Sequence, residues 1–303
     1  ASFIAPLPTI ADTEGPYTYT VSGGEATITD FNSYYSGALS ITNELGGYPV
    51  TTIGANAFSS CTALTSVTIP DSVTSIGDWV FSGCTAIASV TIPDSVASVG
   101  YGAFYGCDSL ASVIIGNSVT SIGSFAFCEC DSLVSVTIPA SVTTIGDSAF
   151  RDCTSLRTVT IPGSVTTIDS QAFSGCTALT SVTIPASVTT IDDAAFSHCT
   201  SLASITVDAA NPNYSSLDGV LFNKARTTLI ECPGGKIGSY FIPASVTTIG
   251  NHAFWNCTFL TNVTIPASVT AIGNSAFSGC SSLTSVTIGT TPLASPSTSG
   301  ASC

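Results

Sequence analysis

Hydrophobic and polar positions repeat with a period of 23 residues along most of this chain. One unit reads L-x-S-V-T-I-P-x-S-V-T-x-I-G-x-x-A-F-x-x-C-x-x. Copies begin at Leu64, Ile87, Leu110, Leu133, Leu156, Leu179, Leu202, Leu260 and Leu283. A degenerate copy occupies 41–63, and the copies at Leu202 and Leu260 are 58 residues apart instead of 23, which leaves an insertion of 35. Such a period predicts a solenoid, in which each coil buries its apolar side against the next.

The pattern inside one unit predicts short strands joined by turns. Apolar and hydroxyl side chains alternate over 66–69, as in a strand with one buried face, and Pro70 ends that strand because it has no N–H to donate. Val73 and Ile76 predict a second short extended segment. Asp78 and its equivalents are typical helix caps, so a helical turn is expected over the following A-F-x-x-C. The predicted fold is therefore mainly β with short helical turns, in about ten coils.

Nine cysteines occupy one register of the repeat. They are Cys61, Cys84, Cys107, Cys130, Cys153, Cys176, Cys199, Cys257 and Cys280. Equivalent residues of neighbouring coils lie about 5 Å apart with parallel Cα–Cβ bonds, whereas a disulfide needs closer, converging Cβ atoms. The pattern favours a column of buried, reduced thiols that act as small apolar residues. Cys128, Cys232 and Cys303 lie outside this column, with their redox state open, and we expect Cys128 at an exposed position.

The composition excludes several classes of partner. The formal net charge is -14, and only 8% of the residues are charged. Nucleic acids and anionic membrane surfaces are excluded as partners, since both need clustered Lys and Arg. No apolar run approaches the roughly 18 residues of a membrane span, so no membrane insertion is expected. A start at Ala1 without methionine fits a mature exported product or a subcloned fragment.

The unit resembles the BspA-like leucine-rich repeats of bacterial surface and secreted proteins, over about 41–289. The segment 208–235 resembles an insertion common in that family, and 17–21 with 24–31 resemble its N-terminal capping strands. The resemblance implies a curved solenoid outside the cell, on the cell surface or secreted, used in several members for adhesion. Three parts are expected: a linker and β cap over 1–40, the solenoid over 41–289 with an inserted hairpin at about 208–242, and a Ser/Thr/Pro-rich linker or frayed end over 290–303.

Catalytic and metal-binding patterns are weak, so no enzyme activity, no cofactor and no metal are predicted. His198 and His252 occupy different registers, and His198 is expected at a surface turn. Columns of aspartates, such as those at Asp71 and Asp94, are interpreted as solvated turn residues. Cys128-Glu-Cys130 alone is a weak zinc pattern because paired Cys or His spacing is absent.

Three surfaces are candidates for binding a partner. The first is the outward strand face, with its threonine column at Thr68, Thr91, Thr137, Thr160 and Thr183. The second is a patch of aromatic residues at otherwise polar positions: Trp79, Tyr101, Tyr105 and Phe125. The third is the insertion, with Tyr214, Lys224 and Arg226 near an expected hairpin turn. Each has a plainer interpretation: solubility of the sheet, cover for the core, or a decorative loop.

These observations favour a non-catalytic, exported or cell-surface protein that recognises a protein or glycan outside the cell. The main alternative is a structural spacer or surface-layer solenoid without its own ligand. Threonine ladders also suggest ice binding, which a curved sheet disfavours because ice presents a flat face. The identity of the ligand, the binding surface, the oligomeric state and any flanking domains stay open.

Overall fold

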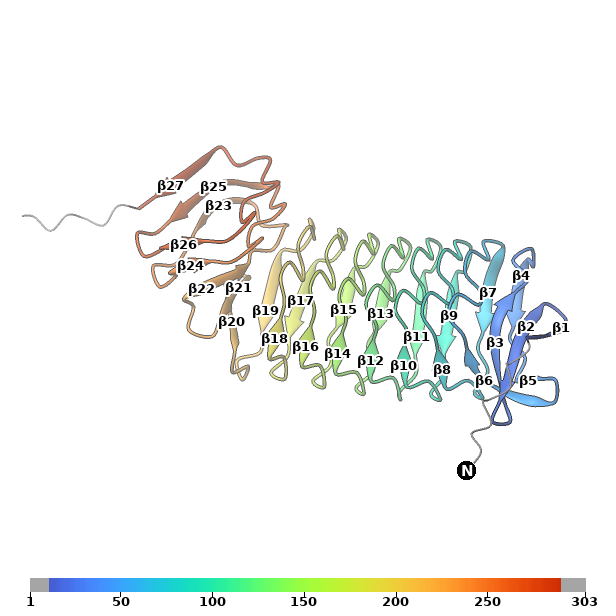
Figure 1. Cartoon of the computed structure of the whole chain (residues 1–303). Helices are drawn as coiled ribbons and strands as arrows, with labels where there is room; N and C mark the ends of the chain where they lie inside the picture. Colours follow the sequence, from blue (N-terminus) through green and yellow to red (C-terminus); the bar gives the residue numbers. More distant parts are fainter. Residues whose placement is uncertain (1–10, 290–303) are drawn as a thin grey trace, which may run out of the picture.

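The chain is a β-solenoid of about 11 turns with a spacing of about 23 residues (Figure 1). The structure is a computed structural model that describes residues 11–289. Those residues form 27 strands and no helix. The prediction of a mainly β leucine-rich-repeat solenoid is confirmed, whereas the predicted linker at 290–303 and Cys303 lie outside the described residues.

An antiparallel cap covers the N-terminal end of the solenoid. It consists of β1 (Asp12–Glu14), β2 (Tyr17–Ser22) and β3 (Glu25–Phe31). β3 pairs in parallel with β6 (Tyr48–Ile53), which also carries the short antiparallel β5 (Glu44–Leu45). The ring of Phe31 lies 4.7 Å from that of Phe58, so the cap covers the first aromatic ring of the core.

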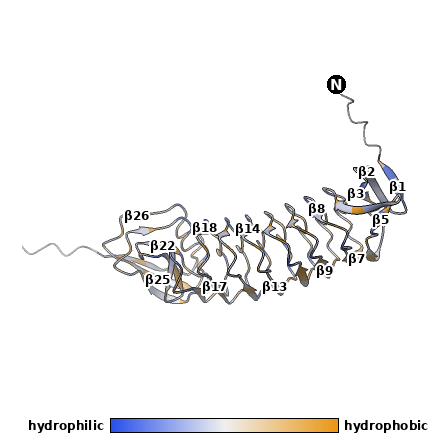
Figure 2. Cartoon of the chain, turned by 90° about the horizontal axis from the view of Figure 1, so that it is seen from below, coloured by the Kyte–Doolittle hydropathy of each residue, from blue (hydrophilic) through white to orange (hydrophobic). Residues whose placement is uncertain are grey.

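Two rows of parallel strands run along opposite sides of the rod (Figure 2). The longer strands are β4 (Gly37–Ser40), β7 (Leu64–Thr68), β9 (Ser89–Ile92), β11 (Ser112–Ile115), β13 (Ser135–Thr137), β15 (Thr158–Thr160), β17 (Ser181–Ile184) and β19 (Ser204–Val207). The shorter strands are β8 (Ser75–Ile76), β10 (Ser98–Val99), β12 (Ser121–Ile122), β14 (Thr144–Ile145), β16 (Thr167–Ile168) and β18 (Thr190–Ile191). Paired residues are one period apart, as in Val67 with Val90 and Ile76 with Val99, so equivalent side chains form columns.

The A-F-x-x-C segments are successive turns, so the predicted helical turns are wrong. In each coil two residues four positions apart around this segment adopt left-handed backbone conformations, with φ of 61° at Asn56 and 60° at Ser60 in one coil. A right-handed helix needs consecutive residues at negative φ, and these residues interrupt it. The freed N–H groups bond to the next coil instead, as in Phe58 N to Val80 O at 2.9 Å.

A column of stacked phenylalanine rings fills the core. From Phe81 to Phe196 the ring centroids of neighbouring coils are 5.3 to 5.5 Å apart, with interplanar angles of 14° or less. The phenylalanine, the leucine and most of the valine and isoleucine side chains of these coils are buried. One motif position therefore always faces the same position of the next coil, which explains why the sequence repeats so closely.

The insertion divides the solenoid into two runs, and the rod changes direction there (Figure 1). Its strands β20 (Tyr214–Leu217), β21 (Val220–Asn223) and β22 (Thr228–Glu231) form an antiparallel meander. β22 then starts a new short row with β24 (Thr248–Ile249) and β26 (Ala271–Ile272), while β23 (Gly238–Phe241), β25 (Leu260–Ile265) and β27 (Ser285–Ile288) form a new long row. The buried apolar residues form two clusters, one in each run.

Candidate binding surfaces

The strand face, defined as the outer surface of the longer strands, carries a column of uncommitted hydroxyls. Its members Thr68, Thr91, Thr137, Thr160 and Thr183 are all exposed. The structure gives their hydroxyls no hydrogen-bond partner within residues 11–289. By contrast, the threonines that precede the shorter strands donate to the preceding coil, as in Thr143 to Thr120 O and Thr166 to Thr143 O, both at 3.3 Å.

Two large apolar side chains interrupt this column. Ile114 takes a threonine position in β11 and is 64% exposed, and Phe241 does the same in β23 at 71%. Ile114 lines a shallow hollow of about 820 Å³ together with Thr68, Thr91 and Asp94. The strand face is therefore a hydroxyl surface with isolated apolar anchors.

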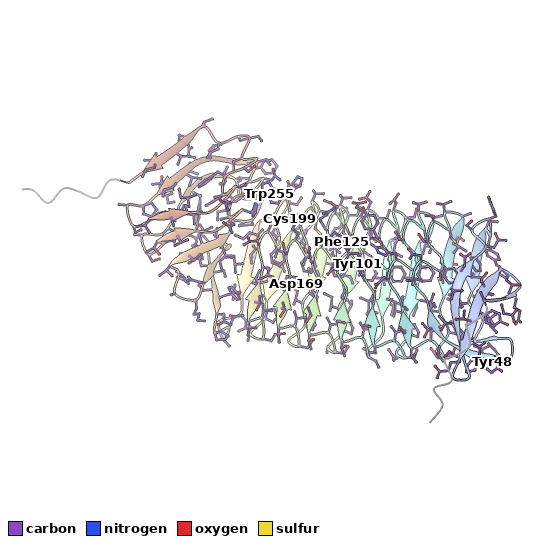
Figure 3. The ribbon with its side chains drawn as sticks, in the orientation of Figure 1. Tyr48, Tyr101, Phe125, Asp169, Cys199 and Trp255 are labelled. Carbon is purple, nitrogen blue, oxygen red and sulfur yellow. The ribbon has the colours of Figure 1, made fainter. Side chains whose placement is uncertain are left out.

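The aromatic patch predicted from the sequence is one interlocked cluster. The ring of Trp79 lies 4.9 Å from that of Tyr101 and 5.6 Å from that of Tyr105, and Tyr101 lies 5.3 Å from Phe125. Figure 3 shows Tyr101 and Phe125 side by side. Trp79 and Phe125 occupy left-handed turn positions with φ of 57° and 58°, and a Cβ on Gly102 would lie 2.3 Å from the Trp79 ring. These rings cover one another, and only Tyr101, at 40% exposure, presents a large open surface.

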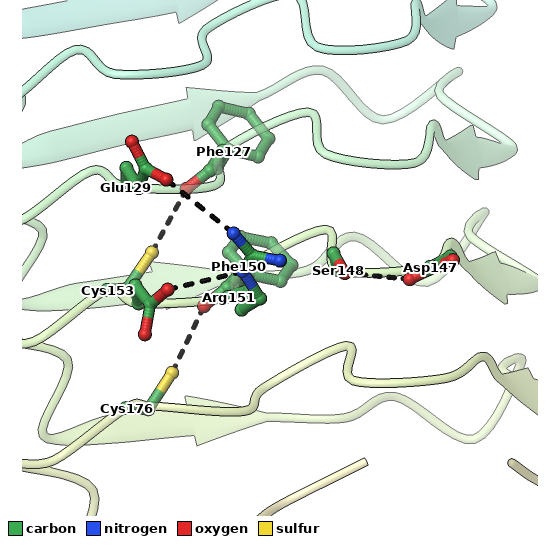
Figure 4. Close-up of polar contacts among 9 residues, drawn as sticks. Phe127, Glu129, Asp147, Ser148, Phe150, Arg151, Cys153 and Cys176 are labelled. Carbon is green, nitrogen blue, oxygen red and sulfur yellow. Dashed lines mark hydrogen bonds and ion pairs between the residues drawn. The ribbon is translucent and has the colours of Figure 1, made fainter. Parts of the chain in front are cut away.

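Charged residues extend this cluster, and Figure 4 shows two of them, Arg151 and Glu129. The guanidinium of Arg151 lies 5.8 Å from the centre of the Phe125 ring and forms ion pairs with Glu129 at 3.6 Å and Asp152 at 3.2 Å. A hydrogen bond to Glu129, followed by burial, raises the pKa of Tyr105 to about 12. Arg151 is thus compensated by two carboxylates.

The three insertion residues singled out in the sequence are tied to backbone groups. The Tyr214 hydroxyl accepts a hydrogen bond from Ile191 N at 2.9 Å, at the edge of β18. Lys224 Nζ donates to two carbonyl oxygens at 3.1 and 2.5 Å, and Arg226 Nη2 donates to one at 3.3 Å. All three also line one hollow of about 530 Å³. The structure therefore brings together Tyr214, Lys224 and Arg226, and groups the aromatic patch elsewhere.

The nine cysteines of the column face the interior, and each of eight donates its Sγ–H to a carbonyl of the preceding coil. Cys153 and Cys176, for example, donate to the carbonyls of Phe127 and Phe150 at 3.1 and 3.2 Å (Figure 4). All eleven cysteines in the described part of the chain are free. Cys128 is fully buried, so the expectation that it is exposed is wrong: its side chain lies among the turns beside Arg151. Burial raises its pKa to about 12, which leaves the thiol protonated and unreactive at neutral pH.

A buried carboxyl group at the insertion was missed by the sequence analysis. Glu231 is 3% exposed, and its oxygens accept hydrogen bonds from Phe196 N at 3.2 Å and Ser197 Oγ at 3.1 Å. In a regular coil the corresponding N–H donates to a carbonyl of the next coil, and the insertion removes that carbonyl. Burial raises the pKa of Glu231 to about 7. The signal in the sequence is a charged residue directly after the apolar pair Leu229 and Ile230.

Residues 11–289 contain no group of three or more His, Cys, Asp or Glu side chains placed to hold a metal ion. His198 is exposed in a turn with φ of 62°. Within the same range, no helix has the length and apolarity needed to cross a bilayer.

Comparisons with known proteins agree with this architecture. The family model of the BspA type leucine rich repeat region matches residues 51–178, 120–240 and 231–297. A leucine rich cell surface protein from Faecalibacterium prausnitzii is 38% identical, with a TM-score of 0.82, over 92% of this chain and 76% of that protein. A leucine-rich repeat protein from Bacteroides ovatus is 28% identical, with a TM-score of 0.69, over 91% of this chain and 76% of that protein.

The pneumococcal vaccine antigen PcpA shares the fold at 23% identity, with a TM-score of 0.65, over 92% of this chain and 70% of the antigen. A search of curated protein sequences gives no match. The repeat unit, the stacked coils and the match over most of the solenoid lead to one assignment: the chain belongs to the BspA-type leucine-rich repeat family, a class of repeat scaffolds for protein interaction.

Proposed function

We propose that this chain is an exported or cell-surface bacterial scaffold that recognises an extracellular protein or glycan through its strand face and catalyses no reaction. The observation that carries the proposal is the difference between the two threonine columns. The hydroxyls of the threonines beside the shorter strands donate hydrogen bonds to carbonyls of the preceding coil, as that of Thr143 does. The hydroxyls of the strand-face threonines have no such bond within residues 11–289 and are available to a partner.

The energetics favour an extended partner. One hydroxyl hydrogen bond contributes only about 0.5–1.5 kcal/mol net, because water competes for it. A partner that follows the rod meets an equivalent hydroxyl on each coil, so small contributions accumulate along its length. Ile114 adds an exposed apolar anchor beside a hollow, the kind of group that strengthens such an interface.

The names of similar proteins support the proposed location. The relative from Faecalibacterium prausnitzii is described as a cell surface protein. The low content of charged residues and the column of thiols are compatible with a location inside or outside the cell. The support for a surface location therefore comes from the description of this relative. The aromatic patch is a second proposed anchor, through the exposed ring of Tyr101.

The test is a binding assay with a matched control on the other side of the rod. Purified chain would be immobilised and exposed to fibronectin, laminin, collagen and mucin. The double variant Thr137→Arg/Thr160→Arg places two long cations on the strand face, and Thr143→Arg/Thr166→Arg adds the same charge to exposed positions of the other row. Saturable binding that only the first variant removes supports the strand face.

Three results would contradict the proposal. Equal loss in both double variants would indicate a general charge effect, and equal retention would place recognition elsewhere. Absence of saturable binding to every probe would favour the structural spacer.

A further inference from the structure

The hollow at the insertion brings together two basic residues, Lys224 and Arg226. The chain has five basic residues in all. Within residues 11–289 both ion pairs belong to Arg151, and Lys236 donates to a backbone carbonyl and lies 5.2 Å from the centre of the Tyr240 ring. Lys224 and Arg226 instead line one hollow of about 530 Å³ without an ion pair in that range. A chain of net charge -14 thus places two cations around one hollow.

Backbone carbonyls hold both cations in position. Lys224 Nζ donates to Ala209 O at 3.1 Å and Asn211 O at 2.5 Å, which leaves one of its three donors free. Arg226 Nη2 donates to Ser216 O at 3.3 Å, which leaves four of its five N–H groups free. Carbonyls are neutral, so they fix the geometry of the cations without cancelling their charge.

The turn between β21 and β22 is itself preorganised. Arg226 has a φ of 55°, a left-handed conformation that is uncommon for residues other than glycine. Asn223 stabilises the turn, since its Oδ1 accepts hydrogen bonds from Thr227 N at 2.8 Å and Thr228 N at 3.1 Å.

The rest of the hollow completes a site for a small acidic ligand. Asp208 lies at the same hollow, and its Oδ1 already accepts Ala210 N at 2.8 Å, so its other oxygen is left to accept a ligand hydroxyl. The half-buried Tyr214 and the side chain of Val207 provide an apolar wall. A long polyanion would be repelled by the acidic surface around the hollow, whereas a single carboxylate would not.

We propose that this hollow binds a carboxylate-bearing sugar at the end of a glycan, such as a terminal uronic or sialic acid. The carboxylate pairs with Arg226 and the remaining donor of Lys224, a hydroxyl donates to Asp208, and the apolar face of the ring packs on Tyr214. Asp208 also borders a strand-face hollow with Thr160 and Thr183, whereas Lys224 and Arg226 do not, so Arg226→Gln and Lys224→Met test this site independently of strand-face recognition.

The experiment is calorimetric titration of the whole chain with glucuronic acid, N-acetylneuraminic acid, the neutral methyl ester of glucuronic acid and a short peptide with a free C-terminal carboxylate. We expect at least one sugar acid to bind about tenfold or more tightly than the ester, because the ester loses a charge-assisted hydrogen bond. Arg226→Gln should weaken that binding about tenfold or more. Arg157→Gln removes the same charge from an exposed position next to β15 and should leave the affinity unchanged.

Lys224→Met provides a second variant, because its aliphatic chain keeps the packing of the stem while the charge is lost. Binding should also weaken as salt rises, in keeping with an ionic contact. The proposal is overturned if acid and ester bind alike, if neither sugar acid binds, or if Arg226→Gln and Arg157→Gln behave alike. Equal affinity for the peptide would show a general carboxylate site and would overturn the assignment to a sugar.

Discussion

The replacement Glu231→Gln is the sharpest test of how the two runs of coils are joined. Glu231 supplies the acceptor that the interrupted coil lacks, through hydrogen bonds from Phe196 N at 3.2 Å and Ser197 Oγ at 3.1 Å. The carboxyl is buried, and the charged group that faces it is Asp193, which also raises its pKa. Glutamine keeps a carbonyl oxygen for Phe196 N and removes the charge.

The magnitude follows from the shift in pKa. Burial, the main cause, raises the pKa of Glu231 from 4.5 to about 7, so the native state binds the proton more tightly than the unfolded state. At about 1.4 kcal/mol per unit, the shift corresponds to about 3 kcal/mol. Stability therefore decreases as the pH rises from about 4.5 to about 7, and the full loss applies above pH 7. Glu231→Gln should be more stable than the parent at pH 8 by up to that amount, with little difference at pH 4.5.

The assay is hydrogen exchange, read by mass spectrometry on a peptide that covers 190–200, between pH 5 and 9 and corrected for the intrinsic exchange rate. A local measurement is needed because long repeat arrays need not unfold in one cooperative step. A peptide around Phe104, whose amide donates to Ala126 O at 2.8 Å, is the internal control. In the parent, protection over 190–200 should decrease as the pH rises, and in Glu231→Gln it should not. Parallel pH profiles in the two proteins would refute this account of the joint.

Three further predictions concern the coils. Phe127→Ala should cost about 3–5 kcal/mol in urea unfolding, because that fully buried ring stacks on two neighbours at 5.3 Å; a loss below 1 kcal/mol would mean the stack relaxes freely. Gly100→Ala should destabilise the protein strongly, because a Cβ there would lie 2.4 Å from Gly77 O. Gly163→Ala is the control and should be tolerated, because its Cβ would meet no atom within 4 Å. Equal melting temperatures of the two variants would contradict this prediction. Thiol titration in denaturant without reductant should detect all eleven cysteines of the described residues, and four or more disulfides in the column would contradict the column of free thiols.

The fold was accessible from the sequence because the same position recurs in every coil. The alternation at Ser66–Ile69 appears in the structure as β7, with Val67 buried and Thr68 exposed. The predicted helical turns failed for a local reason: a capping aspartate such as Asp78 favours a helix, but the following Trp79 has a φ of 57°. Glycine at equivalent turn positions, such as Gly102, was the signal for left-handed backbone.

The candidate sites were less accessible, because their chemistry depends on groups far apart in the sequence. Tyr214 was selected as a candidate partner-binding residue, yet its hydroxyl accepts a hydrogen bond from Ile191 N of β18. Lys224 and Arg226 were selected for their charge, and only the structure shows that they line one hollow. The charge of Glu231 directly after Leu229 and Ile230 is visible in the sequence, but its role depends on which N–H group the insertion leaves without a carbonyl.

The polar groups of the regular coils are mostly hydrogen-bonded to neighbouring coils, so binding capacity lies where the chain departs from the repeat. The amides of their A-F-x-x-C turns donate to the next coil, their thiols donate to the preceding coil, and the threonines of one row, such as Thr166, donate to carbonyls of the preceding coil. Such saturated positions offer a partner little free energy, because each new bond replaces an existing one. What is left to offer is the strand-face hydroxyls, the exposed side chain of Ile114 in the same column, and the cations Lys224 and Arg226 of the insertion. A partner that binds this solenoid should therefore be sensitive to substitutions at those positions and insensitive to exposed changes in the saturated columns.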